Sequence, residues 1–183
     1  MKIGILQIGQ INSDVMQGIQ ENLRMIFPKT TCTIIPKRLP ILEETFDKKR
    51  NQYFSSAILS KIREYAEKEE AFDRVLGIVD VDIFVLELNF VFGEAECPGK
   101  AALISLWRLK PEFYGERPNM ELFLDRSTKE AVHELGHTFC LGHCSNPFCV
   151  MFFSNSIFDT DRKQSLFCNK CYLKVEKIIE KLG

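Results

Sequence analysis

The three histidines of the chain all fall within eleven consecutive residues, HELGHTFCLGH. His133 and His137 are spaced i, i+4, so on a helix their imidazoles lie on one face about one turn apart, as two ligands of a tetrahedral zinc ion must. The helix has to end soon after Phe139 for His143 to approach the same metal, and Gly142 can supply a turn with positive φ. The spacing therefore predicts a metal site with three imidazole ligands.

Glu134 follows the first of these histidines directly. Three neutral imidazoles leave the fourth tetrahedral position of zinc open to water, whose pKa the metal lowers to about 7. Glu134 is placed to take a proton from that water, so the pattern predicts a hydrolase site. The alternative is that the histidines are ordinary helix residues satisfied by hydrogen bonds, which leaves their clustering unexplained.

Four of the seven cysteines form a second group after the third histidine. Cys144 and Cys149 are separated by four residues, and Cys168 and Cys171 by two. Two such pairs about twenty residues apart are typical of a closed structural zinc site with four thiolate ligands. A helix expected over residues 169–181 would begin at the second pair, where its dipole favours thiolate. The alternative is that these are buried free thiols.

The chain has 183 residues, 45% of them hydrophobic and 27% charged, which is typical of one soluble globular domain. Such a chain buries a sizeable core without disulfides. Its net charge of −1 offers no field for recruiting nucleic acid or an anionic membrane. A zinc ribbon for nucleic acid is disfavoured too, because Lys163, Lys170 and Lys174 are too few.

The first eight residues, MKIGILQI, lack a signal-peptide cleavage site, and we interpret them as containing a strand of the mature protein. The most apolar segment, residues 75–92, carries too many polar groups for a membrane span. We therefore expect a cytoplasmic protein, in which clustered cysteines are more often metal ligands or catalytic groups than disulfides. Cys32 and Cys97 stand alone, and we expect both to pack as small apolar residues.

Strands and helices alternate before the histidines, which implies α/β layering. The hydrophobic periodicity predicts strands over 3–8, 31–35, 74–79 and 101–106 and helices over 13–25, 51–68 and 120–139. Pro36 would end the second strand. Asp80 and Asp82 are interpreted as a solvated turn without chemistry. Ser127 and Glu130 could form a capping box if the last helix begins late.

The extended histidine motif, followed by Met151, resembles that of the metzincin zinc peptidases, whose methionine-containing turn lies beneath the metal. The four cysteines around and after this methionine narrow the resemblance to the archaemetzincins. The match covers residues 133–171 in detail. It implies a catalytic zinc held by the three histidines, Glu134 as general base and Met151 in the turn beneath the site. It also implies a structural zinc on four thiolates, from Cys144, Cys149, Cys168 and Cys171.

The resemblance implies an α/β (α+β) fold with a twisted mixed sheet, an antiparallel edge strand and a long active-site helix. A small C-terminal zinc-knuckle subdomain would end in a helix. We expect a single compact domain over 1–183, with residues 1–140 forming the sheet and helix part and 141–183 the C-terminal part.

The implied function is a zinc-dependent peptidase with two Zn²⁺ ions, one catalytic and one structural. It would act on a peptide or protein substrate, without a nucleic-acid or membrane partner, and we expect a monomer. Phe152 and Phe153 after the methionine are candidates for lining an apolar S1′ pocket. The alternative function is a catalytically silent or latent zinc-stabilised interaction module.

One position departs from the family pattern: metzincins normally have glycine three residues after the second histidine, and this chain has Cys140. The turn must then strain a non-glycine residue or shift toward Gly142. The strain would cost about 1–2 kcal/mol. The Cys140 thiol could pack inertly under the turn, compete as a zinc ligand, or oxidise and make the enzyme latent.

Overall fold

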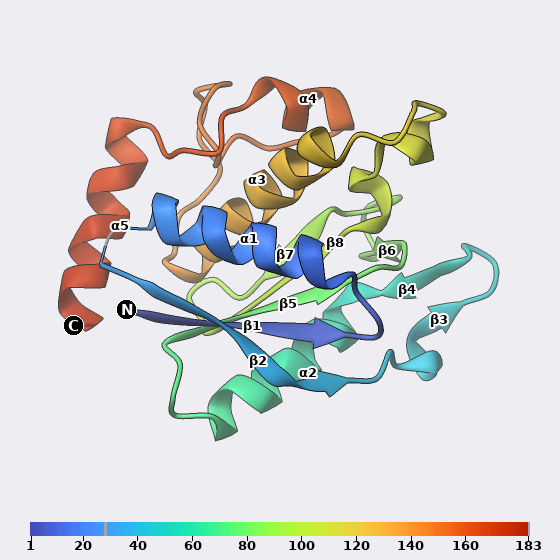
Figure 1. Cartoon of the computed structure of the whole chain (residues 1–183), viewed down its shortest axis with the longest axis horizontal. Coiled ribbons are helices and arrows are strands. Elements are labelled where there is room, and N and C mark those ends of the chain that lie inside the picture. Colours follow the sequence, from blue (N-terminus) through green and yellow to red (C-terminus); the bar gives the residue numbers. More distant parts are fainter. Residues whose placement is uncertain (28, 183) are drawn as a thin grey trace.

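A five-stranded sheet forms the centre of the computed structural model, which describes residues 1–27 and 29–182. Helices α1 (Ser13–Ile26) and α3 (Met120–Thr138) cover one face and α2 (Ser55–Lys68) the other (Figure 1). The strands lie in the order β2 (Thr31–Leu39), β1 (Lys2–Ile8), β5 (Arg74–Val79), β8 (Ala101–Ser105) and β7 (Gly93–Ala95). All neighbours are parallel except β7, which runs antiparallel to β8 at the edge. The predicted mixed sheet with an antiparallel edge strand is confirmed.

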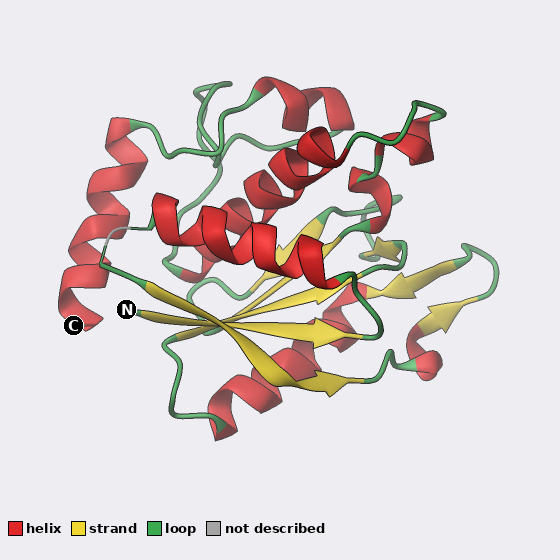
Figure 2. Ribbon diagram, viewed as in Figure 1, coloured by secondary structure: helices red, strands yellow, loops and turns green. Residues whose placement is uncertain are grey.

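Figure 2 shows how the remaining elements surround this sheet. The helices are α1 (Ser13–Ile26), α2 (Ser55–Lys68), α3 (Met120–Thr138), α4 (Ile157–Arg162) and α5 (Asn169–Leu182), with short 3-10 helices over 43–45, 107–109 and 111–114. A small second sheet has the order β3 (Phe46–Asp47), β4 (Gln52–Phe54) and β6 (Ile83–Phe84). Among the described residues, no helix combines the length and apolar character needed to cross a membrane.

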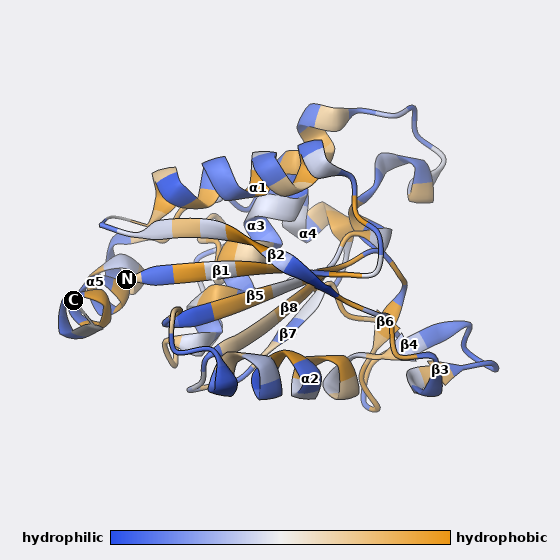
Figure 3. Ribbon diagram, turned by 60° about the horizontal axis from the view of Figure 1, so that its bottom comes forward, coloured by the Kyte–Doolittle hydropathy of each residue, from blue (hydrophilic) through white to orange (hydrophobic). Residues whose placement is uncertain are grey.

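The core lies on both faces of the sheet, because its parallel strands are buried on each side. In Figure 3 the sheet lies between α1 on one side and α2 on the other. The α2 side is filled by Ile58 and Ile62 against Leu6 and Val75. The opposite side is larger, since residues of α1, α3 and α5 share it with the sheet. Helix α3 is therefore buried along most of its length.

Two predicted element boundaries were wrong. Strand β2 continues through Pro36 to Leu39, because β2 is an edge strand and its pairing with β1 shifts in register between Ile34 and Arg38, which leaves Pro36 outside the ladder. The helix expected from residue 51 begins at Ser55, since residues 52–54 form β4 and pair with β3 and β6. Both differences depend on strand neighbours that are distant in sequence.

Asp80 and Asp82 do not form a merely solvated turn, so that interpretation was wrong. Asp82 makes a bidentate ion pair with Arg108, with N–O distances of 2.6 and 2.7 Å. Lys110 donates to Asp80 at 2.6 Å. These pairs attach the segment that connects β8 to α3 to the carboxyl end of β5.

Helix α3 begins at Met120, where the Asn119 side chain accepts a hydrogen bond from the Leu122 N–H at 3.1 Å. The late start that a capping box at Ser127 would require does not occur. The Ser127 hydroxyl instead donates to the Phe123 carbonyl one turn back, at 2.7 Å. The helix therefore runs without interruption from Met120 to Thr138, and its C-terminal half carries the first two histidines of the motif.

Candidate metal centre and active-site cleft

The three histidines converge at the C-terminal end of α3. His133 and His137 project from the helix, and His143 reaches the same point from the segment after it. One ring nitrogen from each lies within 4.8 Å of the other two. The ring centroids are 4.7 to 5.4 Å apart. The predicted convergence of the three imidazoles is thus present in the fold.

The backbone orients two of these rings for metal binding. The Nδ1 atoms of His133 and His137 lie 2.7 Å from the carbonyl oxygens of Val150 and Leu141. A carbonyl only accepts, so each Nδ1 carries the proton and each Nε2 presents a lone pair. The two Nε2 atoms are 3.1 Å apart. Nitrogens bound tetrahedrally to one zinc at about 2.05 Å lie about 3.3 Å apart, so the pair fits a shared zinc.

Burial keeps these imidazoles neutral, which is the form that binds a metal. The pKa of His133 falls well below its ordinary value, first because the ring is desolvated and second because the Lys163 ammonium lies nearby. Desolvation also lowers the pKa of His137 and of the more exposed His143.

Cys140 carries the turn that brings His143 to the site. Its φ is +60°, in the left-handed region, whereas Gly142 has no positive φ. The prediction that a non-glycine residue is strained is confirmed, and the prediction that Gly142 supplies the turn was wrong. Among the described residues, the group of possible ligands here contains only the three histidines, so Cys140 is not placed as a competing ligand.

Glu134 is nearly fully buried between α3 and the edge strand β7. A Cβ atom on Gly93 would lie 2.5 Å from the Glu134 Cγ and 2.6 Å from the Leu103 carbonyl oxygen. Only glycine fits at this close approach. Burial, followed by the negative charge of Glu130, raises the pKa of Glu134 well above its ordinary value. Sequence reasoning missed Gly93, because nothing local marks this contact.

A buried ion pair lies behind Glu134. The Lys163 ammonium, whose side chain is fully buried, lies 3.0 Å from the Glu130 carboxylate. The Thr160 hydroxyl donates to the same oxygen at 2.9 Å. The sequence interpretation counted Lys163 among surface cations and Glu130 as part of a cap. The only available signal was that Glu130 and Glu134 are spaced i, i+4 and so share a face of the helix.

A cleft of about 450 Å³ opens beside these groups. Its walls are β7 with the segments flanking it, the histidines, Glu134 and part of the segment after Met151. Phe153 lines the cleft, as expected, with its ring centroid 4.7 Å from that of His143. Phe152 is not among the lining residues.

Met151 lies against α3, the helix that carries His133 and His137. A Cβ on Gly136, between the first two histidines, would lie 2.3 Å from the Met151 sulfur, so the glycine allows the methionine to pack directly on the helix. Met151 is fully buried, and the neighbouring Val150 carbonyl contacts His133. The turn that contains Met151 therefore supports the histidine cluster from inside the protein.

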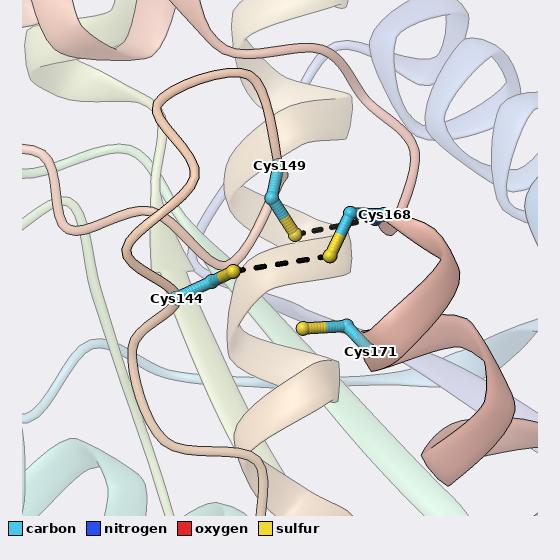
Figure 4. Close-up of side chains that lie close together, drawn as sticks. All are labelled: Cys144, Cys149, Cys168 and Cys171. Carbon is cyan, nitrogen blue, oxygen red and sulfur yellow. Dashed lines mark hydrogen bonds between the residues drawn. The ribbon is translucent and has the colours of Figure 1, made fainter.

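The four cysteines of the second group also meet (Figure 4). Their sulfurs all lie within 4.8 Å of one another, two from the loop after α3 and two from the start of α5. The Sγ atoms of Cys144 and Cys168 are 3.8 Å apart, and the Cys168 N–H donates to the Cys149 sulfur at 3.3 Å. Thiolates bound tetrahedrally to zinc at about 2.3 Å lie about 3.8 Å apart. The group fits a closed zinc site.

The protonation of these thiols differs along the group. Burial raises the pKa of the Cys168 thiol, but hydrogen bonds from the Cys171 N–H and the neighbouring thiols outweigh it and bring the pKa to about 7. Burial, followed by the charge of Cys149, raises the pKa of Cys171. Four thiolates this close repel one another unless a cation lies between them, which again suits a metal ion.

Comparison with known proteins gives consistent results. The family model described as peptidase family M54 matches residues 6–177. The archaemetzincin of Methanocaldococcus jannaschii is 44% identical over 177 residues, covering 96% of this chain and 93% of that one. The archaemetzincin of Pyrococcus abyssi is 43% identical over 176 residues, covering 94% and 93%.

Two solved structures share the fold. The crystal structure of the archaemetzincin from Methanopyrus kandleri has a TM-score of 0.85 and 36% identity, covering 98% of this chain and 96% of that one. The archaemetzincin from Archaeoglobus fulgidus, complexed with malonate, has a TM-score of 0.80 and 37% identity, covering 95% and 99%. The chain therefore belongs to peptidase family M54, the archaemetzincins, and is a zinc metallopeptidase.

Proposed function

We propose that the chain hydrolyses peptide bonds in the cleft between β7 and α3, with Glu134 as the general base. His133, His137 and His143 would hold the catalytic zinc. The observation that carries this assignment is the position of Glu134, which lines the same cleft as three converging imidazoles and adjoins one of them in sequence.

The edge strand supports an extended peptide as the substrate. β7 pairs with β8 on one side only, and its other side borders the cleft. An unpaired strand edge offers N–H and C=O groups to which a peptide adds as a further strand. The substrate's main chain would then lie beside Gly93 and Glu94, with a scissile bond near Glu134.

Glu134 performs the proton transfers in this proposal. It accepts a proton from the attacking water and returns it to the leaving amine nitrogen. Its raised pKa, caused mainly by burial, suits a carboxylate that must hold the proton between the two transfers. When bound, zinc supplies Lewis-acid chemistry by polarising the scissile carbonyl and making water more acidic.

We propose a second, structural zinc on Cys144, Cys149, Cys168 and Cys171, giving two zinc ions per chain. Four sulfurs at zinc-site spacing and the absence of room for a reacting water in a four-thiolate site support this role. Thiolate ligands of this kind favour a reducing compartment, so we propose a cytoplasmic location. Direct zinc analysis of the purified protein tests the count.

We also propose that the protein is a monomer. Its exposed large apolar side chains are distributed over several elements, including Met25 in α1, Phe158 in α4 and Leu173 in α5. Scattered exposed apolar residues are ordinary on monomeric proteins. Analytical ultracentrifugation of the zinc-loaded protein tests this state.

The peptidase proposal is tested with a complex peptide library and zinc-loaded protein, with new termini identified by mass spectrometry. Glu134→Gln preserves the size of the side chain but removes the base. We expect the variant to cleave about 10²- to 10⁴-fold more slowly than the wild type. Its zinc content should be unchanged.

Equal cleavage by both proteins would show a contaminating peptidase or a different base. No cleavage by either, with zinc present, would favour the alternative of an interaction module or a latent enzyme. The substrate library makes the result independent of any guess about the natural substrate.

Phe153 is the candidate determinant of the S1′ pocket. It lines the cleft and its ring contacts that of His143. We expect Phe153→Ala to change the residue preferred after the scissile bond, because it enlarges an apolar wall. Phe158→Ala, at a side chain 78% exposed on α4, is the matched control and should leave the preference unchanged. The same library, compared between variants, measures this; an unaltered preference in Phe153→Ala removes the assignment.

A further inference from the structure

Cys97 and Cys140 meet at one end of the cleft, although 43 residues separate them. Cys97 follows β7 and lines the cleft, and Cys140 forms the strained turn between two histidines. Their sulfurs are 3.7 Å apart and both residues are exposed. The expectation that Cys97 packs as a small apolar residue was therefore wrong. We propose that the two thiols form a redox-active pair that closes reversibly to a disulfide on reaction with a low-molecular-weight disulfide.

Backbone hydrogen bonds hold the two segments side by side. The Gly99 N–H donates to the Thr138 carbonyl at 3.3 Å, which joins the loop after Cys97 to the end of α3. The Glu96 carboxylate accepts from the N–H groups of Lys100 and Ala101 at 3.1 Å each. A disulfide has an S–S length of about 2.05 Å, so the sulfurs must approach by less than 2 Å. The backbone on both sides therefore holds the two cysteines close together.

Exposure distinguishes this pair from the other five cysteines of the chain. Cys32 is buried, and the other four lie in the second metal group. Within the described residues, Cys97 and Cys140 are the cysteines whose side chains are exposed. A soluble oxidant therefore reaches both thiols of this pair, while the four metal-site sulfurs are protected by coordination when zinc is bound.

The chemistry balances as two thiol–disulfide exchanges with oxidised glutathione. The Cys140 sulfur, which accepts a hydrogen bond from the Cys97 thiol, attacks one glutathione sulfur; the glutathione S–S bond breaks and one glutathione thiol leaves. The Cys97 sulfur then attacks the Cys140 sulfur and displaces the second glutathione. The two cysteines lose two electrons and two protons, and these are carried away by two glutathione thiols.

Partial desolvation of its sulfur, followed by the hydrogen bond to Cys140, raises the pKa of the Cys97 thiol, although the residue as a whole is exposed. Cys97 therefore remains the proton donor in the reduced pair and acts second, as the resolving thiol. The product links the end of β7, which borders the cleft, to the turn that precedes His143. The disulfide would thus connect Cys97, which lines the cleft, covalently to the turn that precedes His143.

The experiment equilibrates the zinc-loaded full chain in glutathione buffers of stepped oxidised-to-reduced ratio. Free thiols are then alkylated and tryptic peptides are analysed by mass spectrometry without reduction. We expect a cross-link between the peptides 75–100 and 130–162 that increases with the oxidised fraction and disappears on return to reduced glutathione. Zinc content is measured on the same samples.

Variants assign the cross-link, because the second peptide also contains Cys144 and Cys149. Cys97→Ser and Cys140→Ser should each abolish it and leave one glutathione on the remaining exposed cysteine. Cys32→Ser, at a buried site, is the control and should cross-link like the wild type.

A wild type in which Cys97 and Cys140 remain separately alkylated, or carry separate glutathiones, overturns the proposal. A cross-link that persists in Cys140→Ser also overturns it. Neither measurement depends on peptide cleavage, so the result is distinguishable from failure of the peptidase proposal.

Discussion

Two positions near the three histidines favour glycine for different reasons, one because of its backbone φ and the other because no space is left for a side chain. Cys140 carries a left-handed φ that glycine adopts more easily, at a cost of about 1–2 kcal/mol. Gly93 has no strained φ, but the space of a side chain is already filled by Glu134 and the Leu103 carbonyl. The strained turn at Cys140 follows from the local spacing of the histidines and was predicted. The close approach at Gly93 is a contact between a strand and a helix, and only the packed structure reveals it.

Gly93→Ala tests whether close packing positions Glu134. The added methyl group must displace the Glu134 side chain or the strand, because both lie under 3 Å from the new atom. We expect peptide cleavage to fall about 10²-fold, as for a displacement of a catalytic group by about 1 Å. Zinc content should not change.

Gly142→Ala is the matched control for this variant. Its new methyl group meets nothing within 4 Å, and its φ is not positive, so activity should remain near the wild-type value. Steady-state cleavage by both variants, with circular dichroism to verify folding, provides the comparison. Wild-type activity in Gly93→Ala would contradict the role of this contact.

At the scale of elements, α3 arranges the chemistry through its periodicity. Glu130, His133, Glu134 and His137 recur at spacings of three and four, so they share one side of the helix. Two neighbouring buried carboxylates repel each other, and the segment after α4 supplies Lys163 to offset them. The ion pair therefore connects the C-terminal part of the chain to the helix that carries the site.

Lys163→Met tests this connection. It leaves Glu130 buried without its cation, and we expect a loss of about 3–5 kcal/mol in the free energy of unfolding. The double variant with Glu130→Gln removes both charges and should recover much of that loss. Urea unfolding of the zinc-loaded proteins measures the difference. A single variant as stable as the wild type would show that the pair contributes little.

At the scale of the whole molecule, the two ends of the chain share one core. Ile3 in β1, Leu23 in α1 and Val175 in α5 belong to the same buried cluster. Figure 1 shows α5 beside the start of β1. We propose on this basis that residues 1–140 and 141–183 fold as one unit, 1–183, with the four-cysteine group fixing the start of α5.

Metal removal tests this arrangement in two steps. The histidine site opens to the cleft, so a bidentate chelator should first remove one zinc and abolish cleavage without loss of helical signal. Stripping the four-thiolate site should then weaken the whole fold, since structural zinc sites contribute about 10–16 kcal/mol in small zinc peptides. Zinc analysis, cleavage and circular dichroism are followed together. Readdition of zinc should restore activity after the first step. An intact, equally stable fold after both steps would contradict the structural role.

The sequence by itself determined which side chains form the three-histidine group and the four-cysteine group, and where the elements with strong periodicity lie. His133 and His137 share a helix face because α-helical geometry places residues four apart side by side. The cysteine spacing predicted a four-sulfur cluster, and the strand over 74–79 and the long helix α3 follow from their apolar patterns. These features depend on neighbours within a few residues, or on side chains that a single ion can gather.

The tertiary structure decided what depends on contact between distant segments. Pro36 remains in a strand because β2 lies at the sheet edge, and Lys163 is buried because α3 offers it a carboxylate. Cys97 and Cys140 are neighbours because the loop after β7 bonds to the end of α3. In each case the stabilising contacts join segments that are many residues apart. The spacing of residues along the chain therefore does not reveal them.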